Sequence, residues 1–133
     1  MTKRNFLGCM AVFVLWSVLD LLVHVIILSP HYQNTVALWR EPDAMKPLFM
    51  YAGVLITSVA FTAIYSFLVK QRGARSGIIY GLLWGIGTGS AMGLWSYAVQ
   101  PIPFSLAIIW VLGIITEGVL GGILLSLIIK EDV

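Results

Sequence analysis

The feature that most constrains this chain is a set of four long apolar stretches, each long enough to cross a lipid bilayer. They cover residues 5–28, 47–69, 77–99 and 103–129. A spanning helix needs about 20 mainly apolar residues, because the hydrocarbon core is about 30 Å thick and a helix rises about 1.5 Å per residue. The pattern therefore predicts an all-α, polytopic membrane protein built as a four-transmembrane-helix bundle.

The overall composition supports this class and excludes others. The 133 residues are 59% hydrophobic and 11% charged, with a mean hydropathy of +0.95. Soluble domains carry about 45–50% apolar and about 25% charged residues. A soluble chain this short could not bury so much apolar surface in one core. We therefore exclude a soluble globular domain, a disordered tail and a nucleic-acid binder, and treat residues 1–133 as a single transmembrane domain.

Three connections join the apolar stretches: a long polar loop at 29–46, a short basic segment at 70–76 and a tight turn near 100–102. Pro101 and Pro103 suit that turn, because proline interrupts or starts helices. We expect the first stretch to be a retained helix rather than a cleaved signal peptide. It is longer than the apolar region of a typical signal peptide, and no small-x-small cleavage site follows it.

Basic residues fall mainly on one side of the predicted membrane. Beside the termini and in the 70–76 segment lie Lys3, Arg4, Lys70, Arg72, Arg75 and Lys130, whereas the 29–46 loop holds Arg40 and Lys46. The positive-inside rule then places both termini in the cytoplasm and the 29–46 loop outside. The formal net charge of +2 is thus an orientation signal and not a patch for nucleic acid.

Glycines recur where the last two stretches are expected to pack. They are Gly77, Gly81, Gly85, Gly89 and Gly93 in the third stretch, and Gly118, Gly121 and Gly122 in the fourth. Small residues let membrane helices approach closely, since lipid provides little hydrophobic drive for association. These positions are predicted to form helix-packing faces, either within the chain or toward a homo-oligomer or a larger membrane complex.

Two acidic residues, Asp20 and Glu117, lie inside the apolar stretches. A carboxylate at bilayer depth is costly, so each is a candidate functional residue. His24 follows Asp20 by four positions, which places both on one helix face. By the helical rise, Asp20 lies about 12 Å and Glu117 about 21 Å below the outer ends of their helices. This difference predicts two separate depths rather than a shared-proton pair.

Ser90 and Tyr51 come out at the depths of Asp20 and His24 and complete the polar intramembrane candidates. Two interpretations of Asp20 and His24 stay open: a local structural pair, or a proton or cation path from the outer side. For Glu117 the simplest interpretation is a protonated acid that hydrogen bonds to a neighbouring helix.

The outer loop carries a second group of candidates, namely His31, Tyr32, Trp39, Arg40 and Met45. Residues 33–40 are predicted to form a short surface helix that Pro42 ends. His31 and Met45, with His24 nearby, offer imidazole and thioether groups that suit copper. Their spacing follows no recognised metal pattern, so we expect no metal and no cofactor.

Sequence signatures of common catalytic chemistry do not occur in the chain. It has no phosphate-binding glycine loop, no HExxH and no CxxC. Cys9 is the only cysteine, which excludes an internal disulfide. No catalytic residues can be assigned, and a non-enzymatic role is favoured.

Several of these features together resemble a family of small bacterial four-helix integral membrane proteins with no assigned activity. The matching features are Asp20-x-x-x-His24, Tyr32, Leu38-Trp39-Arg40, Met45, Gly77-x-x-Tyr80-Gly81, Pro101-Ile102-Pro103, Trp110 and Glu117. The resemblance covers most of the chain and implies a multi-pass protein of the bacterial inner membrane. It carries over no catalytic residues.

Three functions are compatible with this sequence. The favoured one is a non-enzymatic accessory or scaffold subunit in the lipid bilayer that packs through its glycine-rich helices. The alternative is a small proton-coupled transporter or channel-like protein that uses Asp20, His24 and Glu117 within the membrane. The third is a membrane enzyme or metal-handling protein that uses the outer loop.

Overall fold

The computed structural model describes residues 2–130, and every regular element in that part of the chain is helical. Four helices are long and apolar enough to cross a membrane. The first joins α1 (Lys3–Leu21) to the π-helix η1 (Leu22–Ile27), and the others are α3 (Pro47–Leu68), α4 (Ala74–Val99) and α5 (Phe104–Ile128). The predicted all-α class and its four apolar helices are therefore confirmed.

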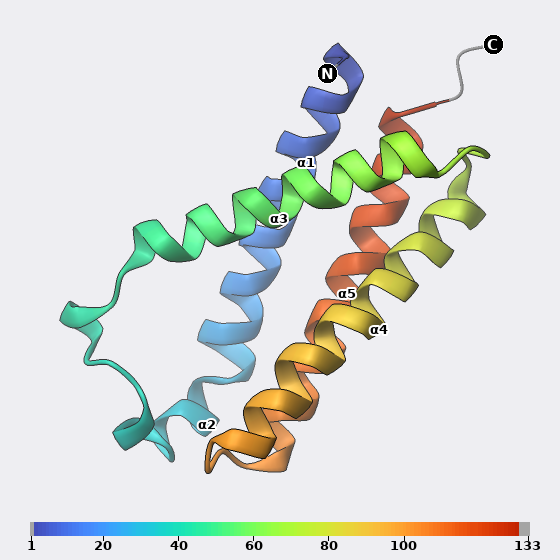
Figure 1. Cartoon of the computed structure of the whole chain (residues 1–133). Coiled ribbons are helices and arrows are strands. Elements are labelled where there is room, and N and C mark those ends of the chain that lie inside the picture. The colour runs from blue at the N-terminus through green and yellow to red at the C-terminus, as the bar shows by residue number, and fades with distance from the viewer. Residues whose placement is uncertain (1, 131–133) are drawn as a thin grey trace.

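The four long helices do not pack equally along their lengths. α4 and α5 form an antiparallel pair, α1 packs against α5, and α3 lies obliquely across α1 and α5 (Figure 1). The buried residues of α3, from Ser58 to Ser66, all lie in its C-terminal half. At the other end, Leu48 and Phe49 are 78% and 73% exposed. The N-terminal half of α3 therefore diverges from the rest of the bundle.

The closest helix contact is between α4 and α5, and glycines lie at its centre. A methyl carbon built on Gly81 would lie 1.9 Å from the carbonyl oxygen of Gly118, and one on Gly77 would lie 2.3 Å from that of Gly122. Ordinary contacts of such a carbon are 3.4–4 Å long. Only glycine allows the two backbones to approach this closely. The buried glycines of α4 are Gly77, Gly81, Gly85, Gly89 and Gly93.

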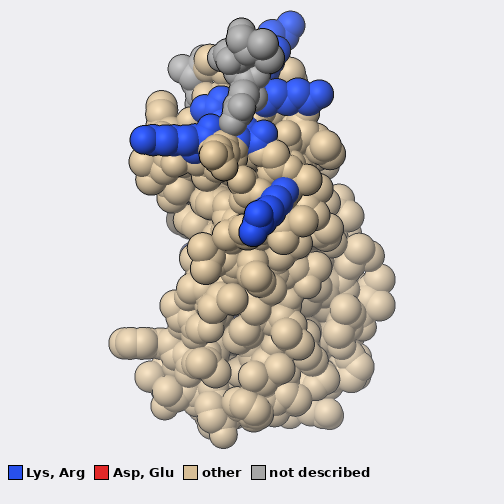
Figure 2. All heavy atoms as spheres, turned by 90° about the vertical axis from the view of Figure 1, so that its right-hand side faces the viewer, with Lys and Arg blue, Asp and Glu red and all other residues tan. Residues whose placement is uncertain are grey.

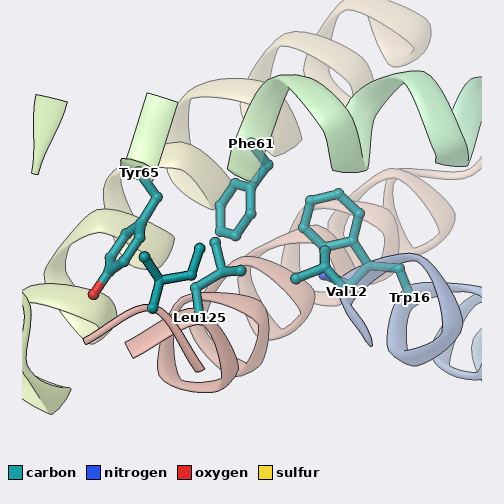
Figure 3. Close-up of a cluster of buried hydrophobic side chains, with 6 residues drawn as sticks. Val12, Trp16, Phe61, Tyr65 and Leu125 are labelled. Carbon is teal, nitrogen blue, oxygen red and sulfur yellow. The ribbon is translucent and has the colours of Figure 1, made fainter. Parts of the chain in front are cut away.

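A buried cluster rich in aromatic side chains joins α1, α3 and α5 (Figure 3). Its members are Val12, Trp16, Phe61, Tyr65, Leu125 and Ile129. The Phe61 ring lies 4.9 Å from that of Trp16 and 4.6 Å from that of Tyr80 in α4, measured between ring centroids. The Tyr80 hydroxyl also donates a 2.6 Å hydrogen bond to the Phe61 carbonyl oxygen. These contacts fix the C-terminal half of α3 against the other helices.

A second buried cluster lies at the loop end of the bundle. Leu28, which directly follows η1, packs with Ile102, Leu106, Ala107 and Trp110. Tyr32 and Trp39 of the 29–46 loop pack against this cluster. The loop therefore folds back over the end of α1 and is not an extended linker.

The local structure of this loop differs from the sequence prediction. The helix expected at 33–40 is wrong: the loop contains α2 (Ser29–Gln33), followed by the 3₁₀ turns η2 (Val36–Leu38) and η3 (Pro42–Ala44). Pro30 in the first turn of α2 starts a helix early, because its fixed φ suits that position. Pro42 likewise opens η3 instead of ending a helix.

Basic side chains gather toward the end of the molecule that holds both termini. Figure 2 shows Lys and Arg side chains in the upper part of one face. At this end Arg72 joins two helix termini, because its guanidinium donates to the carbonyl oxygens of Ser66 at 2.8 Å and Lys130 at 3.4 Å. Cations suit helix C-termini, where backbone carbonyls lack partners.

Candidate functional site

Three of the polar intramembrane candidates meet at a cavity of about 50 Å³ between α1, η1, α4 and α5. A single water needs about 10–15 Å³ of such space, so the cavity has room for a few water molecules but not for a larger solute. Its lining residues are Asp20, Val23, His24, Met92, Trp110, Gly113, Ile114 and Glu117. The three ionisable members are Asp20, His24 and Glu117, and we take this cavity as the candidate site.

Asp20 and Glu117 line the same small cavity, close enough for their charges to interact. The two separate depths predicted from the sequence are therefore wrong. Counting the rise locates only Cα atoms, whereas helical side chains tilt toward the N-terminus of their helix. Because α1 and α5 run in opposite directions (Figure 1), Glu117 reaches toward the loop end while Asp20 reaches away from it.

Trp16 fixes the register of α1 against α5 beside this pair. Its indole N–H donates a 2.8 Å hydrogen bond to the backbone carbonyl oxygen of Glu117. A methyl carbon on Gly121 would lie only 3.0 Å from that indole nitrogen, so the missing side chain leaves room for the ring. Trp16 lies one helical turn before Asp20 in α1. Trp16 and Asp20 therefore lie on the same face of α1.

His24 connects the carboxyl pair to the outer loop. Its Nε2 lies 4.0 Å from Oδ1 of Asp20, and its Nδ1 lies 2.6 Å from the Tyr32 hydroxyl oxygen. The two rings are nearly parallel, with an interplanar angle of 4°. The Asp20 and His24 side chains are 40% and 39% exposed, so both border the open side of the cavity. His24 lies in η1, and π-helical segments occur frequently at functional sites.

Three aromatic residues, Tyr32, Trp39 and Trp110, form an aromatic cap over the loop end of the site. The Trp39 ring meets Tyr32 edge-on at 5.2 Å and Trp110 edge-on at 6.2 Å. The Trp39 indole N–H donates to the Thr35 hydroxyl at 2.8 Å, and that hydroxyl donates to the His31 carbonyl oxygen at 2.8 Å. Aromatic pairs and hydrogen bonds together hold the cap in one arrangement.

Within the cap, the Tyr32 hydroxyl is also hydrogen-bonded to Trp110. The Trp110 indole N–H donates to it at 3.1 Å. Burial is the largest influence on Tyr32 and raises the pKa of its phenol above the ordinary value, although the Trp110 hydrogen bond acts in the opposite direction. Tyr32 therefore stays a neutral hydroxyl at physiological pH.

The remaining sequence candidates do not line the cavity. Tyr51 is 53% exposed on the diverging half of α3, and Ser90 is half-buried on α4 without reaching the cavity. In the loop, Arg40 and Met45 are exposed. The buried Nδ1 of His31 has no hydrogen-bond partner among residues 2–130.

Sequence reasoning found the members of the aromatic cap but did not join them: Tyr32 and Trp39 were loop candidates, and Trp110 came out near the depth of Asp20. Tyr32 and Trp110 are 78 positions apart, so no local spacing shows that they meet. Met92 supplies the α4 wall at the level where Ser90 was expected. The one usable signal was the presence of Tyr32 and Trp39 in a polar loop beside an intramembrane histidine.

Comparison with known proteins adds no assignment. No protein family matches the chain, and neither the curated proteins nor the solved structures give a match. The resemblance to small bacterial four-helix membrane proteins therefore stays a prediction. Within residues 2–130, no group of three or more His, Cys, Asp or Glu side chains is arranged to hold a metal ion.

Proposed function

We propose that this protein binds and transfers protons at a site within the membrane, as a small proton-coupled transporter or channel-like protein does. One observation carries the proposal: Asp20 from α1 and Glu117 from α5 face the same small cavity together with His24. Carboxyl groups at bilayer depth are costly and mark proton relays and ion pathways.

The chemistry of this arrangement suits a proton more than a solute. Two carboxylate charges at one apolar site repel each other, so one proton shared by Asp20 and Glu117 stabilises the pair. His24 can take or release a proton at either ring nitrogen, which suits it to connect the pair with the loop side. The cavity volume of about 50 Å³ admits water and protons and excludes larger substrates.

The scaffold function rests on a weaker basis. It requires glycine faces that remain open to a partner, whereas Gly77, Gly81, Gly118 and Gly122 contact each other inside the chain. Of the glycines in α3 and α4, Gly53 and Gly87 meet nothing within 4 Å. Two isolated glycines on different helices do not make a small-residue face.

We also propose that the protein lies in a bacterial inner membrane with both termini in the cytoplasm. The support is the gathering of basic residues at the end that holds the termini (Figure 2) and the positive-inside rule. In this orientation the aromatic cap and the 29–46 loop face outward, and the site is reached from the outer side through Tyr32 and His24.

Infrared difference spectroscopy of the purified protein during a pH titration tests the proposal, because it detects protonated carboxyl groups directly. We expect a titrating carboxyl band that is altered in both Asp20→Asn and Glu117→Gln, because removal of either acid leaves its partner to titrate alone. Glu41→Gln is the matched control, because Glu41 is an exposed loop acid.

A second measurement tests transfer as well as binding. In vesicles that enclose a pH-sensitive dye, Asp20→Asn should abolish proton uptake while the helical content stays that of the wild type. A titrating carboxyl signal that is the same in the wild type, Asp20→Asn and Glu117→Gln, or proton uptake that Asp20→Asn leaves unchanged, would overturn the proposed function.

A further inference from the structure

The hydrogen bonds around Tyr32 favour one placement of the protons on Tyr32 and His24. An indole N–H can only donate, so the Tyr32 oxygen accepts from Trp110. The Tyr32 hydroxyl proton then has one acceptor within 2.6 Å, which is Nδ1 of His24. A neutral imidazole with an accepting Nδ1 carries its hydrogen on Nε2. That nitrogen is the one that faces Oδ1 of Asp20.

We propose that Tyr32 is a positioning residue that holds His24 in its Nε2–H tautomer and forms the loop-side entrance of the proton relay. This inference rests on the proposed function of the Asp20–Glu117 pair. It adds a direction of access and a role for a residue outside the spanning helices.

The groups that face His24 come from each element packed around it. Asp20 lies on its own helix, Tyr32 comes from α2, Glu117 comes from α5, and α4 contributes only the uncharged Met92. Among residues 2–130 that line the cavity or bond to His24, Tyr32 is the ionisable group nearest the loop. Tyr32 is therefore the hydrogen-bonded group that joins His24 to the loop side.

One transfer can be written with its atoms balanced. Tyr32 takes a proton from a loop-side hydronium ion, which becomes water, as its own hydroxyl proton passes to Nδ1 of His24. The Nε2 proton of His24 passes to the Asp20 carboxylate through water, since 4.0 Å is too long for a direct hydrogen bond. An O–H bond is exchanged at Tyr32, an N–H bond forms at Nδ1 and one breaks at Nε2, and an O–H bond forms at Asp20. The transfer leaves neutral His24 with its hydrogen on Nδ1.

The opposite side of the site is closed by packing. Trp16 bonds to the Glu117 carbonyl there, and Val12 and Phe61 are fully buried beyond it (Figure 3). The structure therefore has a hydrogen-bonded route on the loop side and a dry cluster on the side of the termini. Access through Tyr32 follows from this difference.

Nitrogen-15 NMR of histidine-labelled protein tests the inference, because the chain has two histidines and the two tautomers give distinct ring-nitrogen shifts. The variant His31→Asn assigns the remaining signals to His24. We expect neutral His24 in the Nε2–H form in the wild type and a mixture of tautomers in Tyr32→Phe. Tyr51→Phe is the control, because that tyrosine is exposed on α3.

A pH jump followed by time-resolved infrared spectroscopy separates this inference from the proposed function. The amplitude of the carboxyl band reports the Asp20–Glu117 pair, whereas its rate reports the entrance. In Tyr32→Phe we expect an unchanged amplitude and a rate lowered by about 100-fold, the loss typical when a positioned proton donor is removed. Absence of the carboxyl band in the wild type would contradict the proposed function. The tautomer measurement would still test the role of Tyr32.

Two results would overturn the role of Tyr32. One is a Tyr32→Phe protein in which the His24 tautomer and the rate of the carboxyl band are those of the wild type. The other is a wild-type protein in which neutral His24 carries its hydrogen on Nδ1. Should Tyr32→Phe fail to fold, Trp110→Phe provides the second test. Without the indole donor, the Tyr32 oxygen is free to accept from His24, so the Nδ1–H tautomer should appear. Unchanged His24 signals in Trp110→Phe would contradict the hydrogen-bond argument.

Discussion

Replacement of Gly81 by alanine tests the contact between α4 and α5 most sharply. The new methyl carbon would lie 1.9 Å from the carbonyl oxygen of Gly118 and 2.4 Å from its carbonyl carbon. Ordinary contact starts at 3.4 Å, so the approach is too close by about 1.5 Å. Both obstructing atoms belong to the backbone and cannot rotate away. The helices must separate along the contact.

The size of the effect follows from two opposed contributions. Overfilling a packed contact costs about 1–3 kcal/mol. Alanine is favoured over glycine within a helix by about 1 kcal/mol, and this gain acts at any helical position. Gly87 in α4 is the matched control, because a methyl carbon there meets nothing within 4 Å. Gly81→Ala should therefore lower the free energy of unfolding by about 1–3 kcal/mol, whereas Gly87→Ala should leave it unchanged or raise it by up to about 1 kcal/mol.

Unfolding in mixed micelles with increasing sodium dodecyl sulfate provides the assay, with helical circular dichroism as the signal. The comparison uses the midpoints and slopes of the unfolding curves of the wild type and both variants, measured in the same lipid and detergent mixture. Equal free energies of unfolding for Gly81→Ala and Gly87→Ala would refute the close-contact argument. So would a Gly81→Ala protein that is more stable than the wild type.

Three further predictions follow from other parts of the structure. Trp16→Phe should lower the free energy of unfolding by about 1 kcal/mol through loss of its hydrogen bond to the Glu117 carbonyl, whereas Trp95→Phe, at a residue that is 72% exposed, should not. Burial raises the pKa of Tyr32 in the folded protein. The neutral Tyr32 phenol should therefore contribute fully to the free energy of unfolding below a pH of about 10. That contribution should be lost as the pH rises through the pKa of Tyr32 in the folded protein. A chemical denaturation series at alkaline pH should show a smaller loss in Tyr32→Phe. A cysteine introduced by Gly73→Cys in a Cys9→Ala background should react with a membrane-impermeant reagent only from the cytoplasmic side, and reaction from outside would reverse the proposed orientation.

Hydropathy located the four helices correctly because apolar length is a local property of the sequence. The bounds of α3, Pro47–Leu68, differ from the predicted 47–69 by one residue. The oblique course of α3 could not be predicted in this way, since it depends on which half of the helix finds partners. The Phe61 contacts with Trp16 and Tyr80 supply those partners at one end only.

The candidate site was predictable in its ionisable residues but not in their geometry. Asp20, His24 and Glu117 stand out because an ionisable side chain in an apolar stretch is energetically costly. Their meeting depends on side-chain direction along antiparallel helices, which a count of residues along one helix omits. The hydrogen bond between Tyr32 and Trp110 depends on how the loop folds over Leu28, and that is a tertiary property.

The glycine contact between α4 and α5 also determines which parts of this protein are free to move. Two backbones in direct contact have no flexible side chains between them to absorb a shift, so α4 and α5 act as one stiff frame. α1 meets that frame through side chains such as Trp16 and not through its backbone, so this contact is less stiff than the one between α4 and α5. Asp20 belongs to the movable helix and Glu117 to the frame. Any motion that alternately closes and opens the carboxyl pair therefore takes place at the seam between α1 and α5.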